Sequence, residues 1–176
     1  SKQELLELKI AESLVEAENF DLVAMGRSEG PGCYCYANNV LKAVLGKITA
    51  SYPHVVLDNE AGLENLSRRL VQKVSTVIFV SDPSQSGLRT VRRLHELADE
   101  MEIVYDRSLL AVNRVRGERV PDSVHETAQA IGAQHVVAIP DNDTCAQVAE
   151  SGSSVFGLPE TNPVVAALDS LVDRLV

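Results

Sequence analysis

Thr76–Asp82 reads TVIFVSD, and residues 83–101, which follow it directly, read PSQSGLRTVRRLHELADEM. The first stretch is an unbroken run of β-branched and aliphatic residues, which is typical of a buried strand. In the second stretch the apolar residues recur every three or four positions, at 88, 91, 94, 98 and 101, which predicts an amphipathic helix. A strand that runs directly into a helix is the unit from which parallel sheets are built.

The same alternation recurs along the chain. Further strand candidates are Asp21–Gly26, His54–Asp58, Ser108–Val115 and His135–Pro140, and a last helical stripe contains Val164, Leu168, Leu171 and Leu175. The composition is 45% hydrophobic but only 4% aromatic, so the core is expected to be aliphatic. These features predict an α/β fold, a mostly parallel sheet flanked by helices, formed as a single domain by residues 1–176.

Charge and hydropathy argue against several classes of partner. The formal net charge of −9 disfavours a nucleic-acid or anionic-membrane surface, since phosphate binding depends on clustered cations. No apolar run approaches the roughly 18 residues that span a membrane. Residues 1–20 read SKQELLELKIAESLVEAENF, which predicts an acidic amphipathic helix rather than a signal peptide. With three cysteines in all, a reducing, cytoplasmic setting is expected.

Polar turns follow the strand candidates, and ligands of parallel sheets bind beyond the carboxyl ends of the strands. Asp58 ends the run HVVLD, with Gly62 four residues later, which suits either a water-mediated Mg²⁺ site beside a phosphate or an ordinary turn. Asn113 follows the fourth strand and is either a reader of a purine edge or a turn residue. Pro140 ends the last strand, and the loop after it could lie against a base.

A phosphate-binding loop is not found among the 176 residues. The pattern G-x-x-x-x-G-K-[ST] has no match, because the Gly46–Lys47 pair is followed by Ile48 and no glycine opens the motif. No G-x-G-x-x-G opens a helix either.

Two cysteines, Cys33 and Cys35, stand one residue apart in GPGCYCYANN (residues 30–39). They are either two small packing residues, a redox pair or disulfide remnant, or half of a metal site. Zinc and square-planar nickel both take four ligands, so this pair would need a second copy from a symmetry-related subunit. Cys145 is predicted to be a buried helix residue, and the four histidines show no ligand spacing.

Five stretches of the chain resemble one known family. They are MGRSEGPGCYCYANNVL (residues 25–41), YPHVVLDNEAGLENLSRR (52–69), VIFVSDPSQSGLRTVRRLHEL (77–97), AVNRV (111–115) and AIPDND (138–143). Together they resemble the nickel-insertion accessory ATPases of carbon monoxide dehydrogenase, which belong to the deviant P-loop class of MinD and the nitrogenase iron protein. The family begins with a P-loop strand that has no counterpart here. The resemblance therefore implies an incomplete P-loop NTPase-type fold, the C-terminal portion of a longer parent.

The resemblance also implies roles for single residues. Cys33 and Cys35 match a C-x-C site for nickel or zinc that is shared across a dimer. Asp58 and Gly62 match the Walker-B and switch turn, which in the parent acts on ATP and Mg²⁺.

For the base, Asn113 matches the residue that reads adenine, with Pro140 and Asp141 in the loop beside it. The P-loop lysines and the water-activating aspartate have no counterpart, so hydrolysis by this chain itself is not expected. The partners implied are a second copy in a homodimer or higher oligomer and a recipient enzyme of the carbon monoxide dehydrogenase type.

Two other hypotheses compete with this one. A response-regulator receiver would use Asp58 as phosphoacceptor and Ser81 as switch hydroxyl, but no acidic pair follows a first strand and no lysine follows the fourth or fifth. A non-catalytic scaffold of the same fold would use the cysteines for packing only. For a P-loop-type fold, the unpaired sheet edge that the missing strand leaves predicts self-association.

Overall fold

The structure is a computed structural model, and it describes residues 8, 12–24, 42, 43, 46, 49–59, 72–117 and 119–175. The chain divides into two compact units, Ser1–Val71 and Gln72–Val176, and each is described by itself. The prediction of a single domain over all 176 residues is not tested by this division.

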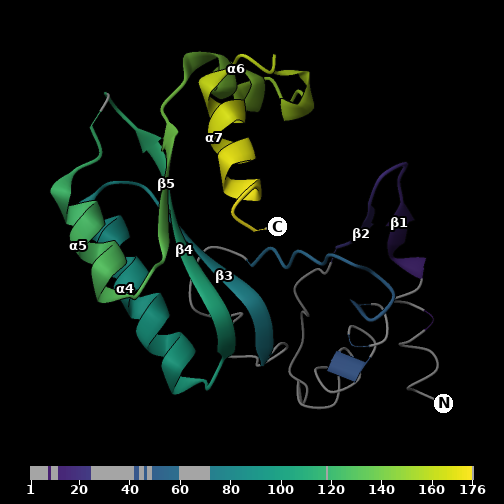
Figure 1. Cartoon of the computed structure of the whole chain (residues 1–176). Coiled ribbons are helices and arrows are strands. Elements are labelled where there is room, and N and C mark those ends of the chain that lie inside the picture. Colours follow the sequence, from purple (N-terminus) through teal and green to yellow (C-terminus); the bar gives the residue numbers. More distant parts are fainter. Residues whose placement is uncertain are drawn as a thin grey trace, which may run out of the picture. The chain divides into compact units, whose positions relative to one another are not determined.

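The unit formed by residues 72–176 is a three-layer α/β/α structure (Figure 1). Its elements in order are β3 (Lys73–Ser81), α4 (Gln85–Glu100), β4 (Val104–Val115), α5 (Asp122–Ala130), β5 (His135–Pro140), α6 (Asp143–Glu150), the 3-10 helix η1 (Val155–Gly157) and α7 (Pro163–Val172). The three strands lie in the order β3-β4-β5, and both pairs are parallel. The predicted parallel α/β fold is confirmed here.

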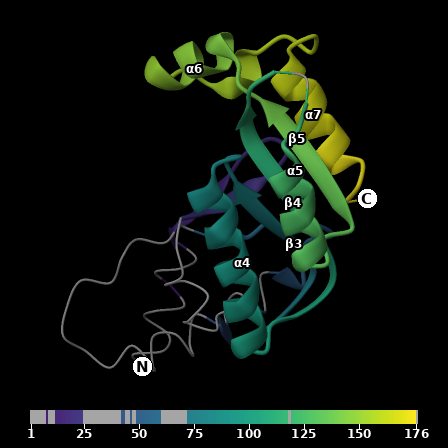
Figure 2. The ribbon, with the colours of Figure 1, turned by 90° about the vertical axis from the view of Figure 1, so that its left-hand side faces the viewer.

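Side chains that alternate along the strands point to opposite faces of the sheet and form two separate hydrophobic cores. On one face Phe79, Leu110 and Val112 pack against α4 and α5, and on the other Ala111, Val137 and Ile139 pack against α7. The two helical layers are seen on opposite sides of the sheet in Figures 1 and 2. The central strand β4 is buried on both faces, since Leu109, Leu110 and Val112 are 0% exposed. This is why its sequence is continuously apolar rather than alternating.

Three predicted strands of this unit are confirmed with small changes in length. The run from Thr76 belongs to β3, which begins three residues earlier, at Lys73, and β4 begins at Val104 rather than at Ser108. The range predicted for β5 is the observed one. The predicted helices at 88–101 and 164–175 correspond to α4 and α7.

The described part of residues 1–71 contains a small hairpin. Its strands are β1 (Leu14–Glu16) and β2 (Asp21–Val23), which pair antiparallel with Leu14 opposite Val23. The prediction of one helix over residues 1–20 is therefore wrong at Leu14–Glu16. The predicted strand from Asp21 exists but is short and antiparallel, because β1 comes immediately before it and a tight turn permits only that direction.

The predicted strand His54–Asp58 is wrong. Residues 54–59 have no regular secondary structure, and Val55, Val56 and Leu57 are 46%, 90% and 41% exposed. A strand is defined by pairing with a neighbour, and no described residue pairs with this segment. Its apolar composition alone does not make it a strand.

No helix in the described ranges is both long enough and apolar enough to span a membrane.

Candidate functional site at the carboxyl edge of the sheet

The loop after β3 is built around the carboxylate of Asp82. Its Oδ1 accepts hydrogen bonds from the backbone N–H of Ser84, at 3.0 Å, and from the Ser84 hydroxyl, at 2.5 Å. Ser84 in turn is the N-cap of α4, and its Oγ accepts from the N–H of Gly87 at 3.1 Å. Asp82 is thereby fixed at the start of the helix, where a negative charge is favoured by the helix dipole.

Gly87 is required by this arrangement. A Cβ atom at position 87 would lie 2.5 Å from Asp82 Oδ1 and 2.6 Å from Ser81 Oγ, closer than non-bonded atoms can approach. The stretch SDPSQSG thus forms one tight unit, in which a glycine lets the helix approach the preceding carboxylate.

The pKa of Asp82 also depends on a charge on the neighbouring strand. The hydrogen bonds from Ser84 lower the pKa of Asp82 below its ordinary value, and the positive charge of Arg114 lowers it further. Arg114 is near the end of the next strand, β4, so the charge at the end of β4 acts on the carboxylate in the loop after β3.

The end of β4 departs from regular strand geometry. Its pairing with β5 shifts between Val112 and Val115, and Arg114, between them, has φ 58°, in the left-handed region. For a residue with a side chain this conformation costs roughly 1–2 kcal/mol. Asn113 stabilises it, because its Oδ1 accepts from the N–H of Arg114 at 2.9 Å. Asn113 itself is exposed.

The end of β5 is tied to the end of β4. Pro140 is the register partner of Val115, and the N–H of Asp141 donates to the Val115 carbonyl at 2.9 Å. The Asp141 carboxylate accepts from Arg116 Nε at 2.9 Å, an ion pair between the two loops. Exposed pairs of this kind contribute only about 0–1 kcal/mol to stability, so the pair orders the loops more than it stabilises the fold.

Two asparagines that are hydrogen-bonded to each other cap the N-termini of α6 and α7. Asn142 is the N-cap of α6, and its Oδ1 accepts from the N–H of Cys145 at 3.0 Å and from Asn162 Nδ2 at 3.2 Å. Asn162, only 6% exposed, is the N-cap of α7 and accepts from the N–H of Val164 at 2.8 Å. One amide oxygen thus connects the starts of two helices.

The predicted base-binding residues Asn113, Pro140 and Asp141 lie on adjacent strand ends of the same sheet edge. Asp58 belongs to the other unit, where it is exposed. The receiver hypothesis requires Asp58 at the end of a strand, and the segment that carries it forms none.

The remaining predicted residues are placed as follows. Gly62, Cys33 and Cys35 lie outside the described residues. Cys145 lies in α6, as predicted, but it is half-buried rather than buried, and it packs against the core on the α7 face. Within the described ranges, no three His, Cys, Asp or Glu side chains converge to hold a metal ion.

Sequence reasoning missed several residues that shape this edge. Asp82 and Gly87 act through close contacts within the loop after β3 and the first turn of α4. Arg116 acts through its ion pair with Asp141 in another loop, which depends on strand register. The spacing in SDPSQSG was the available signal, since an N-capping serine three residues before a glycine at the first turn is a specific combination.

No family model matches the chain, but several characterised and uncharacterised proteins are similar to it. An uncharacterised ATP-binding protein of Methanocaldococcus jannaschii is 35% identical over 176 residues, which is 100% of this chain and 69% of that protein. The carbon monoxide dehydrogenase accessory protein CooC of Rhodospirillum rubrum is 28% identical over 92 residues, 51% of this chain and 35% of CooC. The septum site-determining protein MinD of Bacillus subtilis is 21% identical over 164 residues, 90% of this chain and 61% of MinD. The chain thus spans less than two thirds of the length of CooC and of MinD.

Proposed function

Because this chain belongs to the same family as the Methanocaldococcus jannaschii ATP-binding protein, a MinD- and CooC-like family of P-loop ATPases, we propose that it is part of a metal-enzyme maturation ATPase. In this proposal the carboxyl edge of β4 and β5 receives the adenine base of ATP. Cys33 and Cys35 bind nickel or zinc together with the same pair of a second copy. The observation that carries the proposal is the position of Asn113 beside the Pro140–Asp141 turn.

The chemistry of Asn113 suits adenine. The N6 amino group and N7 of adenine present a donor beside an acceptor, which an asparagine amide can match with both of its ends. In this structure the Asn113 Oδ1 holds the N–H of Arg114, and an amide oxygen keeps a second lone pair for another donor. The NH₂ group of this exposed residue can donate to N7.

The turn at Pro140 supplies the second wall of the proposed base site. Pro140 is half-buried at the end of β5, and its ring has no N–H to satisfy. Asp141 is held by Arg116 and by the Val115 carbonyl, so the turn is ordered before a base arrives. Preordering of this kind reduces the entropy that binding has to overcome.

The proposal assigns the phosphates and Mg²⁺ to Asp58 and Gly62 only as part of the parent protein. A carboxylate that holds Mg²⁺ through water, beside a glycine turn, suits that role. No hydrolytic step is assigned to these 176 residues, because they contain no G-x-x-x-x-G-K-[ST] motif.

The metal assignment follows from ligand number and donor type. Two thiolates fill half of a four-coordinate site, and two copies of Cys33 and Cys35 would complete a set of four sulfurs suited to zinc or nickel. The partners proposed are therefore a second copy of the chain and a recipient enzyme of the carbon monoxide dehydrogenase type.

Base recognition is tested by saturation-transfer NMR with adenosine, AMP, ATP and guanosine. We expect adenosine, AMP and ATP to give equal transfer to the base protons, because the base rather than the phosphates makes the contacts. Asn113→Ala should reduce the signal, whereas Arg119→Gln, a loop variant that leaves Asn113 intact, should not. Equal transfer from guanosine, or an unchanged signal in Asn113→Ala, would contradict the assignment.

Metal binding is tested by titrating the chain with Ni²⁺ and with Zn²⁺ while its solution mass is followed by light scattering. We expect one metal ion per two chains, as the four-sulfur requirement demands. The variant with Cys33→Ala and Cys35→Ala should lose the ion, and Cys145→Ala should keep it. If no ion binds at any concentration, the cysteines serve packing and the scaffold hypothesis is favoured.

A further inference from the structure

Arg114 has a left-handed backbone inside a strand, which no other strand residue in the described part of the chain has. Its φ is 58°, whereas Glu102, the other described non-glycine residue with a positive φ, lies in the turn between α4 and β4. A residue with a side chain keeps such a conformation only where the surrounding structure imposes it. The conformation of Arg114 therefore has a cause in the packing around it.

The cause is a β-bulge that is fixed on both sides. Val112 and Val115 are both paired with β5. Between them β4 has two residues, Asn113 and Arg114, where β5 has only Ile139. In a regular strand, residues three positions apart face opposite sides of the sheet, but here Val112 and Val115 belong to the same core and are 0% and 5% exposed. The burial of both valines thus holds the backbone of Arg114 in place.

The bulge also fixes the orientation of the Asn113 amide. The N–H of Arg114 donates to Asn113 Oδ1 at 2.9 Å. An N–H can bind only the oxygen end of an amide, because the amide nitrogen accepts no hydrogen bond. A half-turn of the amide would therefore break this bond. Asn113 presents a fixed acceptor and, at the other end of the same amide, a donor.

An acceptor beside a donor matches one class of purine. Adenine carries the N6–H donor next to the N7 acceptor, whereas guanine carries two acceptors there, O6 and N7. The second lone pair of the fixed amide oxygen can accept from N6–H. The same oxygen would face O6 of a 6-oxopurine, and two acceptors form no hydrogen bond with each other.

We propose that the left-handed backbone of Arg114 makes this edge of the sheet select 6-aminopurines over 6-oxopurines. Arg114 is a positioning residue: its backbone N–H orients Asn113, and its guanidinium is not needed for the selection. This role rests on the base site proposed above, of which it sets the specificity. The ligand class is a 6-aminopurine nucleoside or nucleotide.

The experiment measures the Kd of the 176-residue chain for three nucleosides by saturation-transfer NMR. Adenosine has the 6-amino group, purine riboside lacks it, and inosine has a 6-oxo group in its place. For the parent we expect adenosine to bind about tenfold more tightly than inosine, with purine riboside between them. In Asn113→Ala the three nucleosides should bind alike.

Two variants of Arg114 separate its backbone from its charge. Arg114→Gly removes the guanidinium but adopts a positive φ freely, so the Kd for adenosine should stay within about twofold of the parent value. Arg114→Val removes the same charge, but a β-branched residue resists a positive φ, so the Kd should rise about tenfold and the preference over inosine should shrink. A role of the charge alone would affect the two variants equally.

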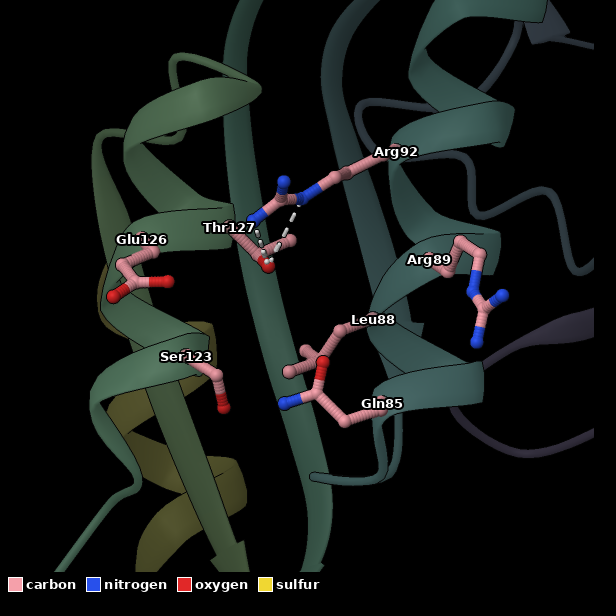
Figure 3. A pocket seen from close by; sticks show the side chains of 7 residues that line it. All are labelled: Gln85, Leu88, Arg89, Arg92, Ser123, Glu126 and Thr127. Carbon is pink, nitrogen blue, oxygen red and sulfur yellow. Dashed lines mark hydrogen bonds between the residues drawn. The ribbon is translucent and has the colours of Figure 1, made fainter.

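A distant variant and a second readout serve as controls. Arg89→Gln removes a cation from α4, where Arg89 is exposed and points away from the contact of Arg92 with Thr127 (Figure 3), and it should leave all three Kd values unchanged. Hydrogen exchange decides if Arg114→Val does not fold. The bond to Oδ1 should slow exchange of the Arg114 N–H about tenfold in the parent relative to Asn113→Ala.

Two results would overturn the role of Arg114 and leave the base site standing. One is an equal Kd for adenosine in Arg114→Gly and Arg114→Val, and the other is equally fast exchange of the Arg114 N–H in the parent and in Asn113→Ala. A parent that binds inosine as tightly as adenosine, or that binds none of the three nucleosides, would contradict the base site itself and the role of Arg114 with it.

Discussion

Two apolar segments with nearly the same pattern behave differently in this molecule. TVIFVSD and HVVLD are both short aliphatic runs that end in aspartate. The first forms part of β3, where Phe79 is 4% exposed, and the second has no regular secondary structure, with Val56 at 90% exposed.

The difference is a difference in neighbours. β3 is paired with β4 from Lys73 to Ser81, and its side chains are covered by α4. Nothing among the described residues pairs with His54–Asp58. An apolar segment can thus form a strand, but it does so only where an adjacent strand pairs with it and a helix covers it.

The largest test of this contrast is a matched pair of Val→Ala variants. Val112 is 0% exposed in β4, so Val112→Ala removes buried methyl groups and leaves a cavity, and we expect the free energy of unfolding to fall by about 2 kcal/mol. Val56→Ala should change it by less than about 0.5 kcal/mol. Urea denaturation followed by circular dichroism measures both. A cost at Val56 as large as that at Val112 would mean that the two segments are equally packed.

A matched pair of glycines gives a smaller effect. Gly87→Ala places a Cβ against Asp82 and Ser81, and we expect a loss of about 1–3 kcal/mol, as in other overpacked sites. At the helical Gly46, no described atom other than those of its chain neighbours and its own helix backbone lies within 4 Å of the added Cβ, so alanine should stabilise this position by up to about 1 kcal/mol. Thermal unfolding of the two variants checks the signs. A neutral Gly87→Ala would show that the loop after β3 can move aside.

The smallest expected effects are changes of stability with pH. One group in each unit is concerned, Asp82 at acid pH and Tyr52 at alkaline pH. At the acid end, Asp82 has its pKa lowered from 3.8 by the hydrogen bonds from Ser84. Its contribution to stability is therefore present above pH 3.8 and is lost as the pH falls through the lowered pKa. Asp82→Asn should be less stable than the parent near neutrality, with the gap closing in acid. Urea denaturation of the parent and of Asp82→Asn at neutral and at acid pH measures this gap, and a gap of equal size at both pH values would contradict the role assigned to the Asp82 carboxylate.

At the alkaline end the relevant group is Tyr52, in residues 1–71. Its hydroxyl donates to Asp21, which raises the pKa of Tyr52 above 10.0. A raised pKa stabilises the protonated form, so this contribution is present below pH 10.0 and is lost as the pH rises through the raised value. In an absorbance titration of the phenols, Tyr52→Phe should lose one phenol that ionises above pH 10.0. If the phenol that is lost ionises at or below pH 10.0, Tyr52 does not form the bond in solution.

The elements that could be predicted are those whose burial produces a regular apolar pattern in the sequence. β3, β4 and β5 were identifiable as aliphatic runs, because strands that are covered on both faces are continuously apolar. α4 and α7 were identifiable as helical stripes, because one side of each helix packs on the sheet. The hairpin of β1 and β2 was not predicted, since Leu14–Glu16 also fits a helical repeat. For segments this short, pairing partners decide the structure.

Of the candidate site, the sequence predicted which residues stand at strand ends but not what they contact. Asn113 and Asp141 were expected at one edge, and they lie on adjacent strand ends. The ion pair of Asp141 with Arg116, and the bond from Asn113 to Arg114, depend on the irregular register at the end of β4. An irregularity of one residue in strand pairing leaves no periodic trace in the sequence.

The shared oxygen of Asn142 has a mechanical consequence. Because it accepts from both Cys145 and Asn162, this one atom joins the start of α6 to the residue that caps α7, twenty residues farther along the chain. We expect a displacement of the Pro140–Asp141 turn to move the start of α7 as well. A change at the carboxyl edge of the sheet would thereby reach the helix that covers one of its faces.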